Sequence, residues 1–201
     1  ELNQSSEYFW VFCDVKQAFW KDRELPDFLK DSYRYNLPNN YRCPKPIISL
    51  AEAYLGEPIN LVEIKKAQSD GIILITSCPS ESSIKGKVEI EIDKLLGEGL
   101  SPSDIAILTL RGKDAILDFK TIGRHKTVFC DDGDITSNII ADSFLRFKGL
   151  ERAAIIIVGL ELVKTGVSNR MYIALTRALT AVRIISDKKT ITNDKILSDL
   201  I

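Results

Sequence analysis

The chain has 201 residues, of which 45% are hydrophobic, and this is enough for one buried α/β core or one core with a small appendage. Its longest apolar stretch, residues 153–158, has only the length of a strand, so we expect no membrane-spanning helix. A formal net charge of −1 excludes a basic field over the whole protein, and any contact with nucleic acid must therefore be local.

The cysteines and the single histidine do not have the spacing of a metal site. The histidine is His125, and the cysteines are scattered without a C-x-x-C pair, at Cys13, Cys43, Cys78 and Cys130. We therefore expect free thiols in the core and no metal centre. The chain starts without a signal peptide or a basic leader, so we expect a cytoplasmic protein and a piece of a longer chain.

The beginning of the chain contains short elements and several prolines. Residues 8–13 form an aromatic and β-branched run that is typical of a strand, and the polar residues Asp14 and Gln17 follow its carboxyl end. These two side chains could contact a ligand. Alternatively, they could make the ordinary hydrogen bonds of a turn, in which the same residue types are common. Residues 26–33 predict a short helix.

A helix preceded by two prolines is predicted over residues 46–54 and ends at Gly56. Apolar residues share one of its faces, namely Ile47, Leu50, Ala51 and Tyr54. Tyr41 and Arg42 therefore lie just before the start of a helix, where a ligand can be bound.

Short apolar strands alternate with helices in the rest of the chain. The strand candidates are residues 72–76, 105–110, 127–130, 138–142, 154–159 and 182–186. The helix candidates are a long one with Ile84, Val88, Ile92 and Leu95 on one face, ended by Gly97 and Gly99, and shorter ones near 113–119, near 168–179 and from Thr192 onward. This alternation predicts an α/β fold with a parallel sheet covered on both faces. In such sheets ligands bind beyond the carboxyl ends of the strands, and we expect the site there.

Common nucleotide and hydrolase motifs are absent from the sequence. There is no G-x-G-x-x-G, and the two Gly-Lys pairs, at Gly86 and Gly112, lack the upstream glycine of a phosphate loop. A Ser-His-Asp hydrolase is unsupported because the sequence has one histidine and no G-x-S-x-G. This chain alone therefore cannot hold a triphosphate and magnesium in the usual P-loop manner.

Four short motifs occur in an order that is typical of one helicase family. Asp14–Gln17 is similar to G-D-x-x-Q, with Cys13 in place of the glycine, and Asn40–Arg42 matches N-Y-R. Ser143–Glu151 is similar to T-x-H-x-x-K-G-L-E, and Tyr172–Ala178 is similar to Y-V-A-x-T-R-A. In this order they resemble the second RecA-like motor domain of UvrD/Rep-type superfamily-one DNA helicases.

The resemblance implies a chain that begins inside a longer helicase. Residues 1–20 would be the last strand and sensor motif of the upstream motor domain, and residues 21–201 the second RecA-like domain. The phosphate loop and the Asp-Glu magnesium motif would lie upstream. ATP and Mg²⁺ would then be bound jointly with that N-terminal helicase domain, and single-stranded DNA would be the polymer partner.

The resemblance also assigns roles at the nucleotide. Gln17 would sense the γ-phosphate and the attacking water, because an amide both donates and accepts hydrogen bonds. Tyr41 would stack on adenine. Arg42 and Arg177 would be arginine fingers, whose planar forks suit the charge on the γ-phosphoryl oxygens. Glu151 would accept a hydrogen bond from a ribose hydroxyl.

Further residues complete the implied sites. Asp14 and Gly149 belong to the nucleotide-binding motifs. Ser143 would donate to a DNA phosphate, and Trp20 would stack on a base of single-stranded DNA.

Several of these residues also have an ordinary structural explanation. Trp20 could be a packed aromatic, Arg42 could form a surface ion pair, and Glu151 could cap a turn. Lys148 could be a solvated turn residue, and we assign it no chemistry.

A rival hypothesis is a degenerate lobe that docks nucleic acid or protein without catalysis. Three departures from the family pattern favour it: Cys13 for Gly, Ser143 for Thr and Leu145 for His. The motor hypothesis is favoured more strongly by four residues that match together, namely Gln17, Arg42, Glu151 and Arg177. On either hypothesis we expect no ATPase activity from this chain alone.

Overall fold

A computed structural model describes residues 11, 27–30, 32–35, 39–56, 60–61, 71–112, 115, 119–132 and 134–201. The chain divides into two compact units, Glu1–Tyr35 and Asn36–Ile201. Within the first unit, helix α1 (Asp27–Lys30) lies inside the predicted 26–33 helix and has an ion pair of 2.8 Å between its terminal residues. The predicted domain boundary after residue 20 lies outside the described residues and stays a prediction, as does most of the strand at 8–13.

The second unit is built on a seven-stranded sheet with the strand order β3-β9-β8-β4-β7-β6-β5. The strands are β3 (Ile72–Cys78), β4 (Ile105–Thr109), β5 (Thr121–Ile122), β6 (His125–Val128), β7 (Ile139–Ser143), β8 (Arg152–Val158) and β9 (Ala178–Asp187). Neighbouring strands are parallel except for the antiparallel pair β5–β6. This confirms the predicted α/β class with a mostly parallel sheet. A separate two-stranded parallel sheet joins β1 (Asn39–Asn40) to β2 (Asn60–Leu61).

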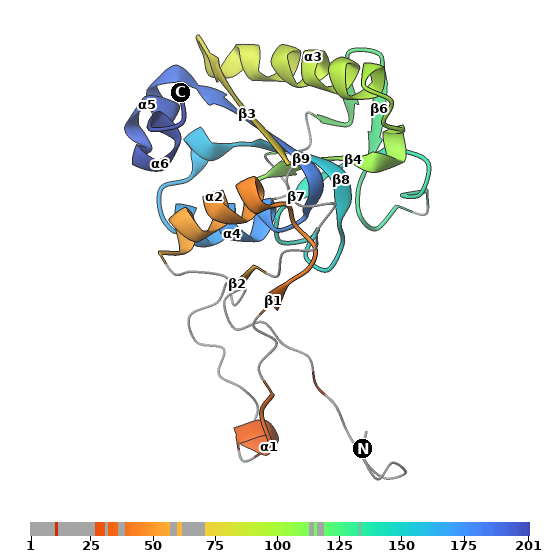
Figure 1. The fold of residues 1–201 in the computed structure, drawn as a ribbon. Coiled ribbons are helices and arrows are strands. Elements are labelled where there is room, and N and C mark those ends of the chain that lie inside the picture. Colours follow the sequence, from red (N-terminus) through yellow and green to blue (C-terminus); the bar gives the residue numbers. More distant parts are fainter. Residues whose placement is uncertain are drawn as a thin grey trace. The chain divides into compact units, whose positions relative to one another are not determined.

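Helices cover both faces of the large sheet. Figure 1 shows α3 on one face and α2 and α4 on the other. The α-helices of this unit are α2 (Lys45–Leu55), α3 (Ile84–Gly97), α4 (Val167–Leu175), α5 (Lys188–Asn193) and α6 (Lys195–Ser198), and the 3₁₀ turns are Glu81–Ser83, Pro102–Asp104 and Leu160–Leu162. Among the described residues, no helix combines the length and the apolar character that a membrane span requires.

One hydrophobic core lies between α3 and the sheet. The four apolar residues predicted on one face of this helix are buried there with alternate residues of the central strands, and the members on α3 are Ile84, Val88, Ile92 and Leu95. Strands β4 and β7 are buried along their whole length, as expected for apolar runs covered on both faces. Cys43 and Cys78 are buried free thiols, in line with the prediction, whereas Cys130 is half-buried.

The boundary between α4 and β9 differs from the prediction. The helix predicted over 168–179 ends at Leu175, and β9 begins at Ala178 rather than at residue 182. The Thr176 hydroxyl donates to backbone carbonyls of the last helical turn and so ends the helix locally. The next residues pair with β8, since Ala178 is in register with Arg152. Tertiary pairing therefore outweighs the helical propensity of the Ala-Leu sequence.

The carboxyl-terminal tail is helical, but earlier than predicted. Asp187 caps α5 by accepting the Thr190 N–H, and Asp194 caps α6 through the N–H groups of Ile196 and Leu197. The β5–β6 hairpin was not predicted. Most of the helix predicted near 113–119 lies outside the described residues.

Candidate functional site

The loop before α2 is held in shape by Asn40. The Asn40 Oδ1 accepts the N–H groups of Arg42 and Cys43 at 3.2 Å and 3.3 Å, and its Nδ2 donates to the Cys43 carbonyl at 2.9 Å. This local ring of hydrogen bonds fixes the backbone at Tyr41 and Arg42. The Tyr41 side chain is exposed on the loop, and the predicted helix start behind it is confirmed.

Arg42 makes an ion pair with Glu151. The Arg42 Nε lies 3.1 Å from the Glu151 Oε2, and both side chains are about half exposed. Glu151 follows a turn in which Gly149 has a φ of 94°, a left-handed conformation that favours glycine. The Lys-Gly-Leu-Glu sequence therefore has a conformational reason for its glycine, and a direct contact of Gly149 with a nucleotide stays a prediction.

Arg177 is held next to the start of β8 through the backbone. The Arg177 carbonyl accepts the N–H of Arg152, the residue after Glu151, at 3.2 Å. The Arg177 side chain is 3% exposed, its Nε donates to the Ile173 carbonyl at 3.2 Å, and its Nη2 donates to the Thr176 hydroxyl at 3.3 Å. In this structure the guanidinium is thus folded onto the end of α4.

Cys43 is a buried residue near these groups. Its Sγ donates to the Thr176 carbonyl at 3.5 Å. Burial raises the pKa of the Cys43 thiol to about 11, while the nearby positive charges of Arg42 and Arg177 act against this and Glu151 adds to it. The thiol is therefore neutral at pH 7, and three predicted site residues lie close enough to act on it electrostatically.

The site lies at the opposite end of the strands from the one expected. Glu151 immediately precedes β8, and Arg177 immediately precedes β9, so both are at the amino ends of adjacent parallel strands. The general rule for parallel sheets favours the carboxyl ends of the strands. These residues lie at the other edge because the motifs end where the strands begin. A register shift in the β8–β9 ladder between Arg152 and Ala154 lies next to the group.

Ser143 is separated from this group. It ends β7, and its side chain is buried. Its Oγ accepts the N–H of Arg146 at 3.3 Å, and the Arg146 Nε lies 3.0 Å from the fully buried Asp142 carboxylate. The observed contacts of Ser143 therefore serve the turn, and its predicted contact with a DNA phosphate stays a prediction.

Three predicted site residues, Asp14, Gln17 and Trp20, lie outside the described residues. The structure gives contacts to three residues to which the sequence analysis assigned no role, namely Asn40, Cys43 and Thr176. Asn40 and Thr176 lie inside the quoted motifs, and an Asn at this position is also typical of an Asx turn. Cys43 had no signal in the sequence, because its role depends on a contact between distant segments.

The described part of the site has groups whose chemistry suits parts of a nucleotide. An exposed tyrosine ring beside an accessible guanidinium fits a base and a phosphate. Its one carboxylate, Glu151, is already paired with Arg42. Across the described residues, no group of three or more histidine, cysteine or acidic side chains is placed to hold a metal. Magnesium ligands therefore cannot be assigned to this part of the chain.

The fold resembles that of a solved structure, the C-terminal domain of a possible DNA helicase from Lactobacillus plantarum WCFS1. The TM-score is 0.52 over 73% of this chain and 87% of that domain. The two chains share a fold. Their sequences are 15% identical, so the likeness concerns the fold alone. No protein-family model matches this sequence, and a search of curated proteins finds no match.

Proposed function

We propose that this chain is the C-terminal motor lobe of an ATP-dependent DNA helicase or translocase of the UvrD/Rep type. The observation that supports this most strongly is that Arg42, Glu151 and Arg177 lie near one another and near the buried Cys43. The segments that meet there are far apart in the sequence, since Cys43 and Thr176 are separated by 133 residues. The motifs that contain these residues follow the order of the helicase family, and the fold resembles that of the C-terminal domain of a possible DNA helicase.

In this proposal, Arg42 exchanges Glu151 for a phosphate. An exposed ion pair contributes only about 0–1 kcal/mol, so the exchange costs little. A guanidinium can hold two phosphate oxygens through parallel N–H bonds. Glu151, once released, is free to accept a ribose hydroxyl, and the exposed Tyr41 is next to Arg42 for stacking on the base. The pair thus keeps both side chains oriented before nucleotide binding.

Arg177 acts as the second arginine finger. To do so, its guanidinium leaves the Ile173 carbonyl and the Thr176 hydroxyl, and closure of a cleft with the upstream domain drives this change. ATP with Mg²⁺, bound jointly with that domain, supplies the phosphoanhydride whose hydrolysis powers the motor. Alternate closing and reopening of the two lobes moves the protein along single-stranded DNA.

A non-catalytic lobe is the second candidate. The burial of Arg177 and its hydrogen bonds within the end of α4 favour it, because such a side chain also serves to stabilise a helix end. The buried position of Ser143 points the same way. Such a lobe would bind nucleic acid or protein with no dependence on ATP.

The deciding experiment is steady-state ATPase of the parent helicase with Arg42→Ala, Arg177→Ala and Arg177→Lys. Arginine fingers contribute about 10³ to 10⁵ in rate, so we expect each Ala variant to lose most turnover with a much smaller change in ATP affinity. Arg177→Lys keeps the charge without the fork and should remain severely impaired.

The matched control is Arg124→Ala, which removes an exposed ion pair with Asp93 away from the site. It should leave turnover within a few-fold. Melting of each variant is followed in parallel. Near-normal turnover in folded Arg42→Ala and Arg177→Ala proteins would show that the lobe is not the arginine-finger half of a motor.

A further inference from the structure

Strand β3 forms one edge of the large sheet (Figure 1). It is the first strand in the sheet order, so among the described residues it pairs with β9 alone. All seven of its residues are in register with β9. An edge strand presents a row of main-chain N–H and C=O groups on its outer side, and such a row is a template for pairing with another strand.

β3 lacks the features that commonly protect a sheet edge. Natural edge strands are often very short, or they contain charged residues, proline or a bulge. The seven residues of β3 read IILITSC, with no charge and no proline, and their ladder with β9 is regular along its whole length. The strand at the other end of the sheet order, β5, has only two residues. Unlike β5, β3 is therefore long enough to pair with a further strand.

Apolar side chains are exposed at this edge. Ile72 is 48% exposed and Leu74 is 43% exposed. Leu74 is in register with Arg183, whose guanidinium binds Glu91 of α3 at 3.2 Å. Side chains of paired residues point to the same face of a sheet, and residues two apart in a strand share a face. Leu74 and Ile72 therefore lie on the face that α3 covers.

One side of α3 carries two lysines and an apolar residue beside this edge. Lys87, Ile90 and Lys94 follow one another at spacings of three and four residues, which places them on the same side of the helix. Lys94 binds Glu91 at 2.7 Å, next to the Arg183 contact. Burial raises the pKa of the Cys78 thiol at the end of β3, and the nearby charge of Lys87 acts against this. This side of α3 is thus a basic and apolar border along β3.

The acidic groups near the end of β3 have partners of their own. Glu161 accepts the Ser186 hydroxyl at 2.7 Å, and Asp187 caps α5. Of the acidic residues that the structure describes, none forms an ion pair with Lys87. The charge of Lys87 is therefore available to a ligand that lies along the edge.

We propose that β3 binds an extended segment of another protein as an eighth strand of the sheet. Main-chain hydrogen bonds to the outer side of β3 provide the affinity, and alternate side chains provide the specificity. On the α3 side, the segment places apolar residues beside Ile72 and Leu74 and acidic residues beside Lys87. The inference goes beyond the proposed function and does not depend on it.

A second copy of the chain fits this edge less well. Two β3 strands related by a two-fold axis perpendicular to the sheet would pair antiparallel, with both α3 helices on the same face. The two β9 strands would then be three strand spacings apart, which is about 14 Å. The lysine-bearing sides of the two helices would face each other, so like charges would meet. A segment that adds a single strand avoids this contact and can carry the opposite charge.

The test is fluorescence anisotropy of the 201-residue chain with labelled peptides of the length of β3. In the probe, two valines and then two aspartates occupy alternate positions, with threonine between them, and the reversed sequence covers the opposite strand direction. We expect one of the two to bind. Lysine in place of aspartate should weaken binding about tenfold or more. Methylation of the backbone nitrogens removes the main-chain donors and should abolish binding.

Variants of the chain locate the bound peptide. Leu74→Lys puts a charge on the edge, as protected natural edges do, and should weaken binding about tenfold or more. Lys87→Glu should weaken binding of the aspartate peptide and strengthen binding of the lysine peptide, a reciprocal change that partial unfolding does not produce. The matched control is Lys126→Glu on β6, five strand positions away from β3, which should leave both affinities unchanged. Melting shows whether each variant is folded.

Each of four outcomes would overturn the proposal. Absence of binding by both peptide directions up to about 1 mM rejects the edge as a binding surface. Equal affinity of wild type and Leu74→Lys places the peptide elsewhere, and equal binding of the aspartate and lysine peptides rejects the acidic partner. A dimer in analytical ultracentrifugation that Leu74→Lys abolishes assigns the edge to a second copy instead. These measurements are independent of the ATPase test of Arg42 and Arg177.

Discussion

Two Arg–Glu pairs in this domain have nearly the same geometry and opposite surroundings. The Arg42 Nε lies 3.1 Å from the Glu151 Oε2, and the Arg183 Nε lies 3.2 Å from the Glu91 Oε2. The side chains of the first pair are 46% and 49% exposed, whereas those of the second are 2% and 5% exposed. The distance between the charged atoms therefore does not determine the role of an ion pair. The exposure of the two side chains decides whether one partner can be replaced by a ligand.

The buried pair joins α3 to the middle of β9. Arg183 also reaches Glu98 at 3.4 Å, and Lys94 adds a contact of 2.7 Å to Glu91. Removing one partner of a buried pair leaves an uncompensated charge, which is the strongly destabilising case. Its natural role is to fix the position of α3 on the sheet. The exposed pair, by contrast, can open with little loss of stability.

The largest expected effect on stability comes from breaking the buried pair. Glu91→Ala should lower the free energy of unfolding by about 3–5 kcal/mol, because Arg183 remains buried without its main partner. Urea unfolding followed by circular dichroism measures this change.

The matched control is the double variant Glu91→Leu/Arg183→Met, which replaces both charges with apolar side chains. It should recover most of the loss, since such replacements are often neutral or stabilising. A loss of less than about 1 kcal/mol in Glu91→Ala would mean that the pair does not differ in kind from the exposed one.

The sequence predicts the elements of this fold better than their arrangement. Apolar runs and helical spacing locate β3, β4, β7, β8, α2 and α3 within a few residues. The strand order and the β5–β6 hairpin depend on contacts between distant segments, which periodicity does not contain. Arg183 shows the same limit, because a charged residue inside an apolar strand gives no sign of the Glu91 carboxylate on another element.

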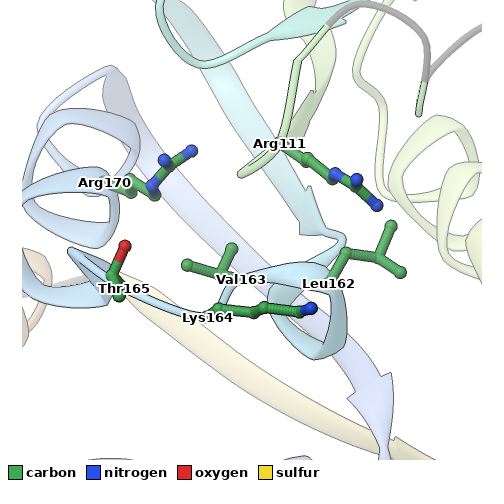
Figure 2. Close-up of a pocket in the computed structure, with 6 residues that line it drawn as sticks. All are labelled: Arg111, Leu162, Val163, Lys164, Thr165 and Arg170. Carbon is green, nitrogen blue, oxygen red and sulfur yellow. The ribbon is translucent and has the colours of Figure 1, made fainter.

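The candidate residues come from motifs, and a general rule about parallel sheets does not locate them. The order of the motifs selected Arg42, Glu151 and Arg177, and the structure brings all three near Cys43. They precede strands, whereas the rule that ligands bind at the carboxyl ends of parallel strands concerns the loops after strands. A pocket lined in part by Arg111, Lys164 and Arg170 (Figure 2) was not visible in the sequence, because these residues belong to no quoted motif.

A smaller effect is expected at Asp187, a charged residue of intermediate burial whose carboxylate is stabilised by backbone N–H groups. Burial alone would raise its pKa, but hydrogen bonds from Thr190 and neighbouring amides outweigh it and lower the pKa below its ordinary value. Asp187→Ala removes the cap of α5 and should cost about 0.5–2 kcal/mol at pH 7. Urea unfolding of the two proteins at that pH measures the difference.

The same residue predicts a pH dependence with a definite sign. A carboxyl whose pKa is lower in the folded state than in the unfolded state stabilises the folded protein fully when the pH is above the unfolded-state pKa. This contribution is lost as the pH falls through the folded-state pKa. The difference between wild type and Asp187→Ala should thus shrink below about pH 4. Asp187→Asn, which keeps a cap without the titration, is the control. A difference that stays constant down to about pH 2 would contradict the assignment.

The smallest expected effect on stability is at the exposed pair, and it decides whether Arg42 is available to a ligand. A double-mutant cycle of Arg42→Ala and Glu151→Ala should give a coupling of about 0–1 kcal/mol, and added salt should reduce it further because exposed charges are screened. Thermal unfolding of the four proteins at low and high salt measures the coupling. A salt-independent value above about 2 kcal/mol would mean that the pair is a structural lock like Arg183–Glu91. Arg42 could then not leave Glu151 for a phosphate at low cost, and its proposed role as an arginine finger would fail on energetic grounds even if the motif were intact.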